Sequence, residues 1–186
     1  MITIVSGLPR SGTSLMMQML QAGGLPILTD QERKPDIDNP RGYCEWEPAK
    51  LLPKQPDRID EAEGKAVKII SELLFSLPRG RDYKLIFMER PLPEVLSSQD
   101  EMLKRRASTD LVDRALLTQA FREHMQHIVS WLEQREEIPV CRVGFRRVLK
   151  DPSGCAQTIR DFLELNLNVE AMARAVDISL YRSRCP

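Results

Sequence analysis

The residues that follow the first apolar run of the chain have the types and spacing of an anion site. They read SGLPRSGTS (6–14), with two glycines that let the backbone turn tightly, so that several N–H groups point at one ligand. Arg10 adds a planar fork of N–H groups that matches an oxyanion. A helical pattern begins directly afterwards and would add the positive end of a helix dipole. The candidate binding residues are Arg10, Ser11, Gly12, Thr13 and Ser14.

The register of this stretch is close to the triphosphate-binding motif G-x-x-x-x-G-K-[ST], with Gly7, Gly12 and Ser14 in place. The lysine position, however, holds Thr13. That lysine neutralises the phosphate being transferred, so its loss should gravely damage triphosphate chemistry. A cradle without it can still hold a phosphosulfate or a diester-like phosphate, with Arg10 supplying the charge.

A second junction between an apolar run and a helical pattern carries another arginine. In KLIFMERPLPEVLSSQ (84–99), Arg90 ends the apolar run and Ser98 follows eight residues later, one to two turns into the next helix. Arg90 can bind a phosphate through two N–H groups while the serine hydroxyl donates a third hydrogen bond. An arginine before a helix is usually just solvated, so the weight of this pattern comes from its pairing with residues 6–14.

Together these motifs resemble those of sulfotransferases that use 3′-phosphoadenosine 5′-phosphosulfate (PAPS). PRSGTSL (9–15) is similar throughout to the family's 5′-phosphosulfate loop, above all in its tyrosylprotein branch. The spacing of Arg90 and Ser98 is similar to the family's 3′-phosphate motif. The resemblance covers roughly residues 1–20, 65–105 and 138–165.

A fainter match lies near the C-terminal end. VGFRRVLKDPSGCAQTIRDFLEL (143–165) resembles a late strand, turn and helix of the family, although Arg146 or Arg147 replaces an acidic residue often found there. The family's C-terminal phosphate-binding segment is not visible, and Arg182 or Arg184 could take its place.

The resemblance also implies catalytic roles, for a reaction that needs no metal. Arg10 stands where the family places the cation that stabilises the leaving group, and Lys68 aligns with a family lysine. Ile70 stands where many cytosolic members carry a catalytic histidine. The chain's two histidines, His124 and His127, fit an ordinary solvated or partly buried helical face.

Some branches of the family use a glutamate as the base instead. The segment DNPRGYCEWEP (38–48) offers Glu45 and Glu47, of which we favour Glu45. Tyr43 and Trp46 in the same segment could bind the acceptor or the adenine, or could anchor the loop.

Alternating strand and helix signals must position these residues. Buried strands are predicted at 2–5, 66–70, 84–89 and 138–143. Helical patterns are predicted at 11–24, 91–106, 110–137 and from Asp151 onward. Strands separated by helices imply a parallel sheet covered on both faces, with ligands beyond the carboxyl ends of the strands. We therefore expect an α/β fold, a P-loop-like three-layer sandwich with a central parallel sheet flanked by helices.

Length and composition set the domain count. The 186 residues suit one domain with a sizeable core, spanning 1–186. A polar, proline-containing excursion at about 29–64 interrupts the pattern, and long excursions in compact domains are often functional.

Charge and cysteine content exclude several classes of protein. Lys and Arg total 27, as do Asp and Glu, so no overall basic field is present to hold nucleic acid or an anionic membrane. Four cysteines without a C-x-x-C pair argue against a zinc site and a disulfide framework. No signal-peptide pattern or membrane-span pattern is present. We expect a cytoplasmic protein with no metal, nucleic-acid or membrane partner.

The sequence thus predicts an enzyme, a sulfotransferase that moves a sulfuryl group from PAPS as co-substrate to a hydroxyl or amine acceptor, small molecule or protein. Two alternatives stay open: a P-loop nucleotide kinase, against which Thr13 counts, and a non-catalytic protein that binds PAPS or its product 3′,5′-diphosphoadenosine (PAP). Because the chain is short for the family, we expect an acceptor pocket that is shallow or completed by another subunit or a protein partner.

Overall fold

The computed structural model describes residues 1–30, 32, 36, 39, 41–105 and 114–180. Within these residues one sheet of five strands forms, in the order β2-β3-β1-β4-β5, and every neighbouring pair is parallel. The strands are β1 (Ile2–Gly7), β2 (Ile27–Leu28), β3 (Ala66–Lys68), β4 (Tyr83–Glu89) and β5 (Val140–Gly144). The expected parallel sheet is confirmed, with β2 as an additional short edge strand.

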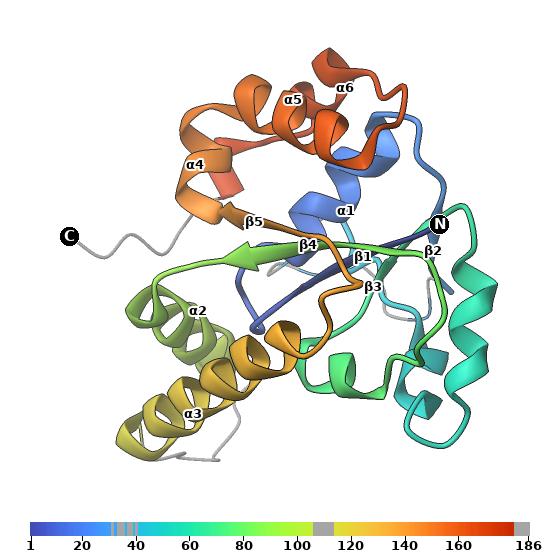
Figure 1. Cartoon of the computed structure of the whole chain (residues 1–186). Helices are drawn as coiled ribbons and strands as arrows, with labels where there is room; N and C mark the ends of the chain where they lie inside the picture. The colour runs from blue at the N-terminus through green and yellow to red at the C-terminus, as the bar shows by residue number, and fades with distance from the viewer. Residues whose placement is uncertain (31, 33–35, 37–38, 40, 106–113, 181–186) are drawn as a thin grey trace.

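Helices cover both faces of the sheet and complete three layers (Figure 1). One face carries α1 (Thr13–Ala22), α4 (Phe145–Lys150), α5 (Pro152–Leu163) and α6 (Val169–Arg174). The other carries α2 (Leu92–Arg105), α3 (Arg114–Glu133) and the 3-10 segments η1 (Glu47–Leu51), η2 (Pro56–Ala62) and η3 (Ser71–Ser76). A last 3-10 turn, η4 (Ile178–Leu180), follows α6.

The central strands β1 and β4 are mostly apolar because both of their faces are largely buried. Ile4 and Leu85 pack on the face of the 3-10 segments, whereas their chain neighbours Val5 and Ile86 pack on the face of α1 and α5. This is the alternation of side chains along a strand, with successive residues buried on opposite faces of the sheet. Each fully buried aliphatic side chain contributes roughly 1.5–3 kcal/mol to stability.

The order of the strands places the loops that leave β1, β4 and β5 next to one another. From β1 the chain first builds β2 and β3 on one side and then crosses to build β4 and β5 on the other. In register, Gly7 at the end of β1 lies opposite Met88 of β4, and Glu89 lies opposite Gly144 of β5. The loops that leave β1, β4 and β5 therefore emerge together at the carboxyl edge, where the reversal of strand order favours a ligand site.

Several short elements were not predicted from the sequence. β2 has two residues, and α4 and α6 have six each, too few to show a period. β3 ends at Lys68 rather than at residue 70, because the chain turns into η3 directly afterwards. The helical pattern at 110–137 corresponds to α3, and its residues 110–113 lie outside the described part of the chain.

In the described part of the chain, no helix has the length and apolar character needed to cross a lipid bilayer. Cys44, Cys141 and Cys155 are free thiols, and Cys185 lies outside the described residues.

Tyr83, at the start of β4, is a buried ionisable group whose pKa differs from that of a free tyrosine. Its side chain is buried and its hydroxyl donates a hydrogen bond to the carbonyl of Pro78 at 3.2 Å. Burial raises the pKa of Tyr83 to about 12, because the phenolate would lose its contact with water, although Arg81 and Arg135 offset part of this effect.

We predict that stability falls as the pH rises from about 10 to about 12. An unfolded tyrosine ionises near pH 10, so in this window the folded state holds the proton that the unfolded state has lost, and the free energy of unfolding decreases. Melting temperatures of the wild type and Tyr83→Phe, measured at about pH 9 and pH 11.5, should show the larger drop in the wild type. Equal drops in the melting temperature of the two proteins would mean that Tyr83 does not cause the loss of stability.

Candidate functional site

The loop between β1 and α1 has the backbone of an anion cradle. Arg10 and Gly12 both adopt left-handed conformations, with φ of 68° and 101°. Such a conformation is costly for arginine and is found mostly where surrounding contacts or function require it. Gly12 is also required sterically, because an added Cβ would lie 2.4 Å from the ring of Phe145. At Gly7, a Cβ would lie 2.5 Å from the carbonyl oxygen of Met88.

The polar groups of this loop fit a bound anion. Ser11 is 1% exposed, and within the described part of the chain its hydroxyl has no hydrogen-bond partner. A buried hydroxyl in that state costs about 1–3 kcal/mol, which an oxyanion acceptor would relieve. The N-terminus of α1 has no side-chain cap, so its first N–H groups face the same loop.

The two arginine motifs meet at this loop. Arg90 donates from Nη1 to the carbonyl of Arg10 at 2.9 Å, and the Nε of Arg10 donates to the hydroxyl of Ser98 at 3.1 Å. Three residues that the sequence assigned to one nucleotide site, Arg10, Arg90 and Ser98, thus form one cluster although they come from two junctions. The side chain of Arg90 is 6% exposed, so its orientation is constrained by packing.

Two contributors to this cluster were missed from the sequence. Glu94 is fully buried and accepts a hydrogen bond from the Nε of Arg90 at 2.9 Å, and its place four residues after Arg90, in the first turn of α2, was a usable signal. Phe145 lies under the guanidinium of Arg90, 4.6 Å from carbon to ring centroid. Nothing local indicated that contact, because Phe145 comes from the β5–α4 junction.

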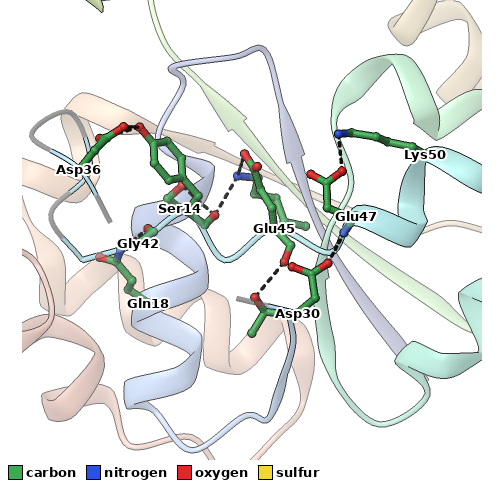
Figure 2. A network of polar contacts seen from close by, with 11 residues as sticks. Ser14, Gln18, Asp30, Asp36, Gly42, Glu45, Glu47 and Lys50 are labelled. Atoms are coloured by element: carbon green, nitrogen blue, oxygen red, sulfur yellow. Dashed lines mark hydrogen bonds and ion pairs between the residues drawn. The ribbon is translucent and has the colours of Figure 1, made fainter. Parts of the chain in front are cut away.

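Two of the candidate catalytic residues, Lys68 and Glu45, contact each other close to the first turn of α1. The Nζ of Lys68 donates to the carbonyl of Tyr43 at 2.8 Å and lies 3.1 Å from a carboxylate oxygen of Glu45. Ser14, in the first turn of α1, donates to the same Tyr43 carbonyl at 3.1 Å. Lys68 and Glu45 are therefore brought together beside the anion loop, and Figure 2 shows Glu45 near Ser14.

The segment that carries Glu45 is tied down on both sides. Gln18 of α1 donates to the carbonyl of Gly42 at 3.2 Å, and Thr29 donates to the carbonyl of Glu45 at 2.8 Å (Figure 2). Tyr43 and Trp46 are each 5% exposed, and Trp46 packs into the core. Of the roles left open for these aromatic residues, the structure favours anchoring of the loop over contact with adenine or acceptor.

The remaining candidates that the structure describes are Ile70 and the two histidines. Ile70 is 42% exposed on the turn after β3. His124 places its Nε2 2.9 Å from the hydroxyl of Ser71, whereas His127 is exposed. Arg182 and Arg184 lie outside the described residues.

A nucleophilic thiolate finds little support at the site. Burial raises the pKa of the Cys44 thiol, an effect that Lys68 only partly offsets, so a nucleophilic thiolate is disfavoured. Among the residues that the structure describes, no three His, Cys, Asp or Glu side chains are grouped to hold a metal ion.

Comparison with known proteins identifies the fold. No family model and no curated protein matches the sequence. Among solved structures, the chain is similar to the sulfotransferase domain of the Synechococcus PCC 7002 olefin synthase, with a TM-score of 0.57, 13% identity, and coverage of 95% of this chain and 77% of that one.

Mouse sulfotransferase SULT7A1, solved in complex with PAP, gives a TM-score of 0.53 and 15% identity over 99% of this chain and 66% of that one. The sulfotransferase domain from the curacin biosynthetic pathway gives a TM-score of 0.53 and 14% identity over 98% of this chain and 78% of that one. The chain therefore has the fold of sulfotransferase domains. Its similarity to the tyrosylprotein branch stays a prediction.

We predict that Gly12→Ala destabilises the protein more than a matched glycine substitution does. The left-handed backbone costs an L-residue roughly 1–2 kcal/mol, and overlap with Phe145 adds about 1–3 kcal/mol. Gly24 has a similar φ of 97° with nothing within 4 Å of its added Cβ, so Gly24→Ala should show the backbone cost alone. Equal losses in urea denaturation would mean that Phe145 does not pack against Gly12.

Proposed function

We propose that this protein is a PAPS-dependent sulfotransferase that transfers a sulfuryl group to a hydroxyl or amine acceptor. The observation that carries the proposal is the cluster of Arg10, Arg90 and Ser98 at the sheet's carboxyl edge. A nucleotide with charged groups on both its 5′ and 3′ sides needs two adjoining anion sites, and the cluster joins two. The fold shared with sulfotransferase domains, one of them complexed with PAP, supports the same ligand.

The two charged groups of the nucleotide bind at different places, one at the β1–α1 loop and one at the junction of β4 and α2. The 5′-phosphosulfate fits the β1–α1 loop, where Ser11, Thr13, Ser14 and the N-terminal N–H groups of α1 supply donors. The 3′-phosphate fits the second junction, where Arg90 offers a fork and Ser98 a hydroxyl.

The transfer itself assigns a role to each remaining residue. The acceptor's oxygen or nitrogen forms a bond to sulfur while the bond from sulfur to the oxygen bridging to the 5′-phosphate breaks. The electron pair of that bond stays on the bridging oxygen, where the charge of Arg10 stabilises it, and PAP leaves. The acceptor's proton passes to the carboxylate of Glu45, which Lys68 holds in position.

We predict that PAP binds without metal at micromolar affinity and that ATP with Mg²⁺ binds far more weakly. Arg90→Ala should cost about 1.5–3 kcal/mol of PAP binding, the value of a charged hydrogen bond. Isothermal titration calorimetry measures the affinity of the wild type for PAP and for ATP with Mg²⁺, and the affinity of Arg90→Ala for PAP. Arg142→Ala, which removes an exposed arginine paired with Glu89 on the neighbouring strand, should leave PAP binding unchanged.

Tighter binding of ATP with Mg²⁺ than of PAP would contradict the proposed function and favour the alternative, a P-loop nucleotide kinase. An Arg90→Ala variant that binds PAP as well as the wild type would remove the 3′-phosphate assignment.

We predict that Glu45→Gln lowers the rate of sulfuryl transfer by about 10²- to 10⁴-fold and leaves PAP binding unchanged, because a general base contributes that much. Transfer from radiolabelled PAPS to a panel of alcohols, phenols and amines measures the rate. Glu47→Gln is the matched control, because Glu47 is a neighbouring carboxylate that pairs with Lys50 instead (Figure 2). Equal rates for wild type and Glu45→Gln would exclude Glu45 as the base.

A further inference from the structure

A third arginine reaches the 3′-phosphate side of the site. Arg146, the second residue of α4, pairs through its Nε with the buried carboxylate of Glu94. The other carboxylate oxygen of Glu94 pairs with Arg90 at 2.9 Å. Glu94 is thus shared by two guanidinium groups from different junctions, and Arg90 also contacts the backbone of Arg10.

The sheet explains why these arginines meet. Glu89 and Gly144 lie opposite each other in register on β4 and β5, so Arg90 and Phe145 are the next residues beyond the same edge. Phe145 stacks under Arg90, and Arg146 follows it into the first turn of α4. The spacing of Arg90 and Arg146 is therefore set by strand pairing.

Two arginines share the buried carboxylate of Glu94. The pairing of Arg90 with Glu94, both almost fully buried, already matches one cation with one anion. Arg146 adds a second cation whose side chain is 57% exposed, so it reaches solvent while its Nε contacts Glu94. Two guanidinium groups therefore share one carboxylate, and the exposed side of Arg146 can offer N–H groups to a phosphate dianion.

We propose that Arg146 is a further ligand of the nucleotide's 3′-phosphate and helps to select a 3′,5′-diphosphate over a nucleotide without the 3′ group. This inference rests on the proposed function. Glu94 acts as the fixed counter-ion that positions Arg146 and Arg90 side by side.

The test compares PAP with adenosine 5′-monophosphate, which lacks the 3′-phosphate, by calorimetry without metal. Arg146→Ala should weaken PAP binding about tenfold, the effect of one charged hydrogen bond, and leave binding of the monophosphate unchanged. Arg147→Ala is the matched control, because Arg147 is the next residue and is exposed, and it should change neither affinity. Arg146→Lys should fall between the wild type and Arg146→Ala, since it keeps a charge but loses the fork.

A double-mutant cycle separates direct binding from an effect through Glu94. If Arg146 contacts the phosphate, Arg146→Ala should weaken PAP binding about tenfold in the Glu94→Gln background as well. If the substitution has no effect there, Arg146 only neutralises Glu94 and the proposal is wrong. It is also wrong if Arg146→Ala weakens both nucleotides equally.

The outcome for the wild type distinguishes this inference from the proposed function. A wild type that binds PAP no better than the monophosphate removes the 3′-phosphate site altogether. If the wild type binds PAP more tightly than the monophosphate and Arg146→Ala keeps the same preference, only the role of Arg146 is overturned and the proposed function stands. Thermal melts of each variant show whether the fold is kept, and Arg146→Lys, which keeps the charge beside Glu94, decides the question if Arg146→Ala unfolds.

Discussion

The parallel pairing of β1 with β4 is the constraint on which the site depends. It runs from Ile2 opposite Tyr83 to Gly7 opposite Met88, and it ends where both chains leave the sheet. A shift by one residue would turn the core side chains of β4 to the wrong face, so the register is firmly specified. Because the register is specified, the carbonyl of Arg10 lies within hydrogen-bond distance of Arg90, and the two anion-binding loops become one site.

Buried charge then orders the rest of the site. Lys68 and Glu94 are both buried, and each is held by more than one polar partner. Removing a partner from such a group leaves charge without compensation, which costs several kcal/mol, so these side chains have little freedom to move. The same contacts that stabilise the fold thus pre-organise the groups that would meet the nucleotide and the acceptor.

Elements with a long apolar or helical pattern were predictable, and short ones were not. The runs that became β1, β3, β4 and β5 could be located because they are mostly apolar, α1 by its helical spacing and α5 by its Asp151-Pro152 start signal. β2, α4 and α6 are held by their neighbours rather than by their own periodicity. Of these, α4 matters most, since it delivers Phe145 and Arg146 to the site.

The sequence by itself determined the anion loop, because glycine spacing, hydroxyl side chains and a following helix are local features that require no distant partner. It also indicated Arg90 with Ser98 as a pair, and Lys68 and Glu45 as separate candidates. Only the tertiary structure decided that these residues meet around one loop, that Tyr43 and Trp46 are buried, and that Glu94 joins two arginines. Those contacts join residues from different strand ends, and strand pairing, which no local pattern records, brings them together.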